Sequence, residues 1–334
     1  MPRVPSLGNG VAVPILDDQF PELLEMLRGT ELPEPGSDFL VDWMGVRTRI
    51  PMLPWAPREL AGRTTTQLPI PDDGYRSEDF EYVALARAIR DVTKQPFRII
   101  EIGAGWAPWA VAAMIAARHR GLPAIGIAVE ADPRKCEWAC QHARDNNVTV
   151  TQVSGKPRHL ATRLRDAVAQ WRGDDQLLIV IEAAAWHETT TVEFPEAPIE
   201  DMGTAVWTMP GTDVDYRGAH LRHRKIAAIS VQDLLEAIRA PHDAPIDLLH
   251  VDVQGVEFEL LERTAGAIQD NTRLMAVGTH NRLSEGQLQY FFLERGWGLL
   301  IDKPCKARFT MTHPTLSGFT EQDGMQLWEN PFLL

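Results

Sequence analysis

Several residues that can exchange protons or bind polar ligands fall where predicted strands end. The candidates are Glu101–Gly105, Glu130, Glu182–Trp186, His250–Gln254 and Thr279–Asn281. In an open parallel sheet the ligand crevice lies outside the carboxyl ends of the strands, so these positions are expected to surround one crevice. His250, Asp252 and Gln254 should point to the same side of their strand because successive side chains alternate. Three polar side chains on one side of an otherwise apolar strand indicate that they contact a polar ligand or other polar groups.

Asp252 and His280 are the candidate catalytic residues. A carboxylate beside an imidazole can hold the ring in one tautomer and stabilise its charge while a proton is taken from an acceptor hydroxyl. In a second interpretation, Asp252 caps the turn that follows it and the backbone satisfies His280. In a third, Asp252, Glu257 and His280 bind a divalent metal ion that orients the acceptor. The sequence leaves these three roles open.

The stretch FRIIEIGAGWAP (97–108) predicts a buried strand, a glycine turn and the start of a helix. Gly103 and Gly105 permit a sharp turn and leave no side chain between the backbone and a ligand. Pro108 suits the first turn of a helix, where a missing N–H costs little. Glu130 ends the next predicted strand, where its carboxylate can accept hydrogen bonds from both hydroxyls of a ribose. A dinucleotide-binding turn would have a small residue in place of Pro108.

The elements that must position these residues alternate between strands and helices. Strands are expected at 97–102, 124–129, 176–182, 225–230, 245–252, 272–279 and 298–301, and helices at 77–92, 107–118, 133–145, 157–171, 231–239 and 284–295. This alternation predicts an α/β fold with a mainly parallel sheet and helices on both faces. Residues 148–153 and the helix at 157–171 are interpreted as an insertion before the strand at 176–182, and residues 189–194 as the arm of a β-hairpin. The tail, 309–332, is expected to carry a last edge strand.

Two segments are expected to lie outside the regular layers. Residues 1–74 are rich in proline and turn residues and should form a cap or wrap over a main domain of residues 75–334. The stretch 196–224 is rich in Gly, Asp and Pro, has little periodicity, and predicts a mobile loop that could cover a substrate. The basic run at 220–225 fits either a solvated loop or a contact with an anionic substrate.

The charge and the cysteine content of the chain argue against some classes of partner and of fold. The net charge of −13 argues against a nucleic-acid partner, because a phosphate backbone needs a basic face. Three cysteines are too few for a disulfide scaffold. Neither a signal peptide nor an apolar run of membrane-spanning length is visible, which predicts a cytoplasmic protein. The oligomeric state is not indicated.

The segments EIGAGWAPW, VEADP, EAAAWHE, SVQDLL, HVDVQGVE, VGTHN and DGMQLWENP follow one another along the chain. In this order they resemble the FkbM family of class I S-adenosylmethionine-dependent methyltransferases, over residues 75–330. The resemblance implies a Rossmann-like, seven-stranded sheet, S-adenosyl-L-methionine as donor, and O-methylation of a saccharide or secondary metabolite. It implies that Asp252 faces the transferred methyl group. The donor-binding residues would be Glu101, Gly103, Gly105, Trp106, Glu130, Glu182 and Ala184.

Two positions depart from the family pattern. Gln254 replaces an acidic residue, which weakens a metal role for that segment. The stretch 182–185 offers no aspartate for the adenine amino group, so Glu182 or backbone atoms would have to serve. The alternatives are an NAD(P)-dependent oxidoreductase and a non-catalytic module that binds the donor or a partner. N-methylation, which needs little from a base, is a further variation.

Overall fold

The structure is a computed structural model that describes residues 14–70, 79–92, 96–206, 214, 220–240, 243–311 and 315–333. Its centre is an eight-stranded sheet in the order β13-β16-β12-β11-β4-β5-β7-β6. The strands are β4 (Phe97–Ile102), β5 (Ala124–Glu130), β6 (Thr149–Val153), β7 (Gln176–Glu182), β11 (Ile246–Val251), β12 (Thr272–Thr279), β13 (Gly298–Lys303) and β16 (Gly324–Glu329). Neighbouring strands are parallel, except that β16 runs antiparallel to both β12 and β13.

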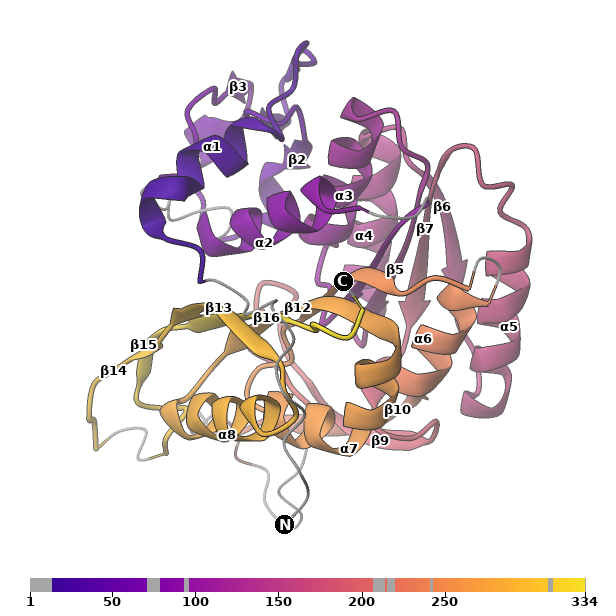
Figure 1. Cartoon of the computed structure of the whole chain (residues 1–334), viewed down its shortest axis with the longest axis vertical. Coiled ribbons are helices and arrows are strands. Elements are labelled where there is room, and N and C mark those ends of the chain that lie inside the picture. The colour runs from indigo at the N-terminus through magenta and orange to yellow at the C-terminus, as the bar shows by residue number, and fades with distance from the viewer. Residues whose placement is uncertain are drawn as a thin grey trace.

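Helices cover both faces of this sheet (Figure 1). One face carries α2 (Asp79–Arg90), α3 (Pro108–His119) and α4 (Pro133–Asp145), and the other carries α5 (Pro157–Ala169), α6 (Val231–Arg239), α7 (Glu257–Asn271) and α8 (Arg282–Leu293). Each face has its own hydrophobic core. The expected Rossmann-like α/β fold is confirmed. Residues 77 and 78 of the first predicted helix lie outside the described residues.

Three strands differ from the sequence-based expectation. Residues 149–153 are not an insertion, because β6 pairs with β7 and forms the edge of the sheet. The sheet has eight strands instead of seven: it gains β6 and β16, whereas the expected strand at 225–230 belongs to a second, smaller sheet. The expected edge strand in the tail is also wrong, because β16 lies between β12 and β13 and is buried along its whole length. Gln326 and Glu329 interrupt the apolar run that a central strand usually shows, although both are buried.

The described part of the N-terminal segment packs against α2, α3 and α4. It contains α1 (Phe20–Glu25), short 3-10 helices at Asp17–Gln19, Ile50–Met52 and Arg58–Leu60, and a small sheet of β1 (Phe39–Val41), β2 (Arg47–Arg49) and β3 (Arg63–Thr64). Arg49 forms an ion pair with Asp145 of α4 at 2.6 Å. The Trp43 ring lies 5.7 Å from that of Tyr82 on α2. Residues 14–70 therefore share a core with the main domain.

A second small sheet has the order β8-β10-β9. Its strands are β8 (Ala184–Trp186), β9 (Thr191–Glu196) and β10 (Arg222–Ser230), and a separate hairpin pairs β14 (Lys306–Ala307) with β15 (Thr320–Gln322). The antiparallel pairing of β9 with β10 confirms the predicted hairpin arm and places residues 222–225 of the basic run in a strand. Of the predicted loop at 196–224, residues 207–213 and 215–219 lie outside the described residues.

Gly103 is the point where the loop after β4 touches the loop after β11. Its φ is +77°, and a Cβ at this position would lie 1.7 Å from the carbonyl oxygen of Asp252. The Asp252 N–H in turn donates to the carbonyl oxygen of Ile102 at 2.9 Å. Only glycine satisfies both the backbone conformation and the close approach.

We expect Gly103→Ala to destabilise the protein more than Gly121→Ala. Both glycines have positive φ, so each variant carries the cost of a left-handed alanine, about 1–2 kcal/mol. At Gly121 the added methyl group meets no atom within 4 Å, whereas at Gly103 it meets backbone. Urea unfolding monitored by circular dichroism measures both losses. Equal losses of unfolding free energy in the two variants would contradict a close contact between Gly103 and the carbonyl oxygen of Asp252.

Candidate active site

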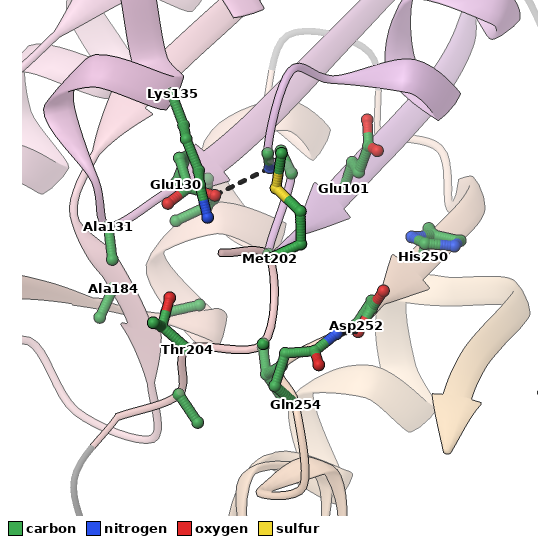
Figure 2. A pocket seen from close by; sticks show the side chains of 18 of the residues that line it. Glu101, Glu130, Ala131, Lys135, Ala184, Met202, Thr204, His250, Asp252 and Gln254 are labelled. Atoms are coloured by element: carbon green, nitrogen blue, oxygen red, sulfur yellow. Dashed lines mark hydrogen bonds between the residues drawn. The ribbon is translucent and has the colours of Figure 1, made fainter. Parts of the chain in front are cut away.

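A cavity of about 470 Å³ opens at the carboxyl ends of β4, β5, β7 and β11. Side chains from these ends line it together with residues 202–206 and Trp55 of the N-terminal segment. Figure 2 shows Glu130 and Lys135 on one side of the cavity, and Glu101, His250 and Asp252 on the other. Four of the five predicted positions contribute to the cavity wall, whereas residues 279–281 are not among the described residues that line it.

The side chain of Glu101 lines the cavity, and its carboxylate caps the N-terminus of α3, the helix that follows the glycine turn. Its two oxygens accept hydrogen bonds from the backbone N–H groups of Trp109 at 3.2 Å and Ala110 at 2.7 Å. The side chain is buried, and this burial raises the pKa of Glu101 to about 7, against the charge of His250 and the two N–H donors. Glu101 thus fixes the first turn of α3 and leaves only its free lone pairs for a ligand.

Glu130 closes the glycine turn from the neighbouring strand. One oxygen accepts from the Gly105 N–H at 2.8 Å, and the other accepts from the Asp132 N–H at 2.7 Å. Burial raises the pKa of Glu130, while the nearby charge of Lys135 opposes the shift. Because a carboxylate oxygen can accept two hydrogen bonds, both oxygens can still accept from hydroxyl groups in the cavity.

The structure separates Glu182 from the other predicted donor-binding residues. Glu182 is not among the described residues that line the cavity, and its carboxylate accepts from the Gln152 amide at 3.3 Å. The cavity wall at this point is instead formed by residues 183–185, including Ala184. Trp106 also lines the cavity, where its ring lies 5.8 Å from the ring of Trp55, which is 48% exposed.

Asp252 reaches the cavity from the turn after β11. Its carboxylate is 36% exposed and accepts from the Gln254 amide at 2.6 Å. Gln254 itself has φ +58° and lines the cavity. Partial burial raises the pKa of Asp252, while the charges of His280 and His250 oppose this shift. His250, Asp252 and Gln254 all line the cavity, but the reason given by the sequence is wrong. β11 ends at Val251, so only His250 lies on the strand, and Val253, which was expected on the other side, lines the cavity too.

His280 lies behind Asp252 and is not among the described residues that line the cavity. Its Nδ1 is 2.8 Å from Oε1 of Glu257, and its Nε2 is 3.3 Å from Oδ1 of Asp252. These carboxylates outweigh the effect of burial and raise the pKa of His280 to about 10. At neutral pH the ring is therefore an imidazolium, which cannot accept a proton. Of the two predicted bases, only Asp252 is free to act as one.

Asp252, Glu257 and His280 are residues of types that bind metal ions, and the described structure brings them together. One ligand atom from each of Asp252, Glu257 and His280 lies within 4.8 Å of the others. The third role considered for these residues, metal binding, is therefore geometrically open.

Three charged residues that sequence reasoning did not assign to the cavity also line it: Glu81, Lys135 and Asp323. Glu81 on α2 contacts Nε2 of His250 at 2.9 Å, and Lys135 donates to the carbonyl oxygen of Asp201 at 2.6 Å. The position of Glu81 in the first turn of its helix suggested only a favourable contact with the helix dipole. No local pattern identified Lys135 or Asp323 as part of a site.

A protein of known sequence is similar to this chain over most of its length. No family model matches. The chain is 27% identical over 293 residues to a protein of Jannaschia sp. (strain CCS1) named "Putative methyltransferase", covering 87% of this chain and 92% of that protein.

Solved structures resemble the chain only distantly. Human methyltransferase 10 domain containing protein matches with 11% identity and a TM-score of 0.37, covering 86% of this chain and 89% of that one. The METTL16 MTase domain matches with 11% identity and a TM-score of 0.36, covering 75% and 66%. Methyltransferase FkbM from Methylobacillus flagellatus KT matches with 11% identity and a TM-score of 0.35, covering 75% and 55%. The chain thus spans just under two thirds of the METTL16 domain and about half of the FkbM protein.

In the described part of the chain, no helix is both long and apolar enough to cross a membrane.

The buried Glu101 gives a pH-dependent prediction. Its pKa in the folded protein, about 7, lies above its ordinary value of 4.5, so its contribution to stability is present in acid and is lost as the pH rises to 7. The difference in unfolding free energy between Glu101→Gln and wild type should therefore move in favour of the variant between pH 4.5 and 7. Urea unfolding across this range measures it. Glu137→Gln, at an exposed position on α4, is the control, and a constant difference for Glu101→Gln would contradict the assignment.

Proposed function

We propose that this chain is an S-adenosyl-L-methionine-dependent methyltransferase that methylates a hydroxyl group of a saccharide or secondary metabolite. The observation that carries the proposal is the position of Glu130. Its carboxylate bonds to Gly105 of the glycine turn and lines the cavity, which is where a ribose would be held. The motif order along the chain and the 27% identity to a protein named as a methyltransferase support the same activity.

The residues around the cavity fit the proposed donor. Glu130 would accept hydrogen bonds from the ribose hydroxyls, and the backbone at 183–185 would meet the adenine. Gly103, Gly105 and Trp106 would lie along the donor, and Glu101 would face its amino-acid end. No atom lies within 4 Å of the place where a Gly105 side chain would begin, so the turn leaves open space for a ligand. The cavity volume of about 470 Å³ also suits a ligand of this size.

Asp252 is the group best placed to take the acceptor's proton. When bound, S-adenosylmethionine supplies a methyl group already activated by its sulfonium sulfur, so the protein must mainly align the acceptor and remove its proton. The raised pKa of Asp252 makes its carboxylate a stronger base at neutral pH. His280 acts as a positioning residue, because its imidazolium ring lies 3.3 Å from Asp252 and is held from behind by Glu257.

The charge of the cavity favours a neutral or cationic acceptor. Glu81, Asp252 and Asp323 all line it, and the chain has a net charge of −13. A nucleic acid would meet these carboxylates with its own phosphates, and it would gain little from the single lysine of the lining. An oxygen acceptor uses the base that the site offers, whereas an amine would need little from it.

Calorimetric titration with S-adenosylhomocysteine tests the donor site. Glu130→Ala should weaken binding by about 10- to 100-fold, because hydrogen bonds to a charged carboxylate contribute about 1.5–3 kcal/mol. Glu182→Ala is the matched control, since Glu182 is the direct register partner of Glu130 on β7 but is not among the described residues of the cavity wall. It should bind as wild type does. Binding of NADH in place of S-adenosylhomocysteine would instead identify an oxidoreductase.

Asp252→Asn tests the chemical step. The variant keeps the shape of the side chain but removes the base, so turnover should fall by about 10²- to 10⁴-fold. The measurement is S-adenosylhomocysteine formed from S-adenosylmethionine with a panel of saccharides and hydroxylated metabolites. Affinity for S-adenosylhomocysteine should stay unchanged in the same variant. Full turnover by Asp252→Asn would remove the base role and favour an amine acceptor.

A further inference from the structure

The ring of His280 is held in the way that a metal-ligating histidine is held. Its Nδ1 is bonded to Oε1 of Glu257 at 2.8 Å. Its Nε2 lies 3.3 Å from Oδ1 of Asp252 and 4.0 Å from Oδ2 of Asp323. In the part of the chain that the structure describes, Nε2 approaches these two carboxylates without a hydrogen bond to any group. One nitrogen is thus fixed, and the other faces two carboxylates. In the absence of a cation this second nitrogen carries a proton at neutral pH, and a bound cation would displace that proton.

Glu257 is better suited to orient the ring than to bind an ion with the same oxygen. Its Oε1 accepts not only from His280 but also from the backbone N–H groups of Gly255 at 2.9 Å and Val253 at 3.3 Å. Glu257 is fully buried, so this oxygen cannot turn toward solvent. Histidines that bind metals usually donate their other N–H to a carboxylate or carbonyl behind them, which fixes the tautomer. Glu257 has this position.

We propose that Nε2 of His280 and the carboxylates of Asp252 and Asp323 form a binding site for one divalent cation, with Glu257 supporting the imidazole from behind. Two carboxylates and one imidazole suit Mn²⁺ and related ions that accept both oxygen and nitrogen ligands. The cluster differs from an ordinary acidic surface patch in two ways. Its imidazole is 94% buried, since the His280 side chain is 6% exposed. Glu257 also keeps a buried oxygen, Oε2, without a hydrogen-bond partner among the described residues.

The position of the site indicates what the cation would do. Asp252 and Asp323 both line the cavity, so the remaining coordination positions face the space that an acceptor would enter. A cation there would bind the acceptor's oxygen and make its hydroxyl proton more acidic, and the Asp252 oxygen that does not bind the cation would take this proton. This role rests on the proposed function, and it favours acceptors that carry two neighbouring oxygens able to share the ion. Cation binding itself does not depend on methyl transfer.

Titration with Mn²⁺ alone, followed by electron paramagnetic resonance, tests the site. The full chain is first treated with a chelator, and binding is read from the loss of the six-line signal of free Mn²⁺. Wild type should bind one ion with ¹⁴N modulation from an imidazole. Asp323→Asn, His280→Gln and Glu257→Gln should each weaken binding by about 10- to 100-fold. The modulation should disappear in His280→Gln.

Asp323→Asn is the decisive variant, because its side chain is 58% exposed and its replacement should leave the fold intact. Glu321→Gln is the matched control: Glu321 lies two residues away, is also exposed, and pairs with Arg308 at 3.5 Å. It should bind Mn²⁺ as wild type does. Absence of Mn²⁺ binding in wild type, or wild-type binding by Asp323→Asn, would overturn the site. Calorimetry with S-adenosylhomocysteine on the same samples reports separately on the donor site, so failure of either proposal is distinguishable from failure of the other.

Discussion

The contact between Gly103 and the carbonyl oxygen of Asp252 is the constraint on which the site depends. It joins the turn that would hold a donor to the turn that carries the candidate base. β4 and β11 are adjacent and in register, with Ile102 opposite Val251, so neither turn can move without the other. A displacement of about 1 Å can cost a transfer reaction about 10²-fold. The sheet therefore fixes the distance between the proposed donor-binding turn after β4 and the turn after β11 that carries Asp252. The loops only have to supply the side chains.

The acidic character of the protein extends into its interior, where each buried carboxylate of the site has dedicated partners. Glu101 caps α3, Glu130 bonds the backbone of its own and the neighbouring loop, and Glu257 accepts three donors. A buried charge without such partners would be strongly unfavourable. The backbone N–H groups of the turns thus act as the counter-charges of this site. Glu101 and Glu130 still line the cavity, together with Glu81, Asp252 and Asp323, so the cavity wall is strongly acidic.

The part of the site that follows from local pattern could be predicted from the sequence. The stretch 97–108 predicts strand, turn and helix by itself, and Glu130 is placed by the end of its strand. Contacts over long separations could not be predicted: Glu81 meets His250 across 169 residues, and nothing near either residue indicates this. Glu182 illustrates a finer limit, because a strand end fixes which residues come near the cavity but not which way the last side chain turns. The protonated state of His280 depends on Glu257, whose distance only the fold determines.

The position of β16 has a consequence for how the protein is made. This strand is translated after β12 and β13, yet it lies between them and pairs with both. Until residues 324–329 join the sheet during folding, β12 has a free edge of unpaired backbone groups, and such edges favour pairing with other chains. Asp323 immediately precedes the strand that covers this edge. The folding chain therefore brings Asp323 to the cavity in the same step that covers this edge.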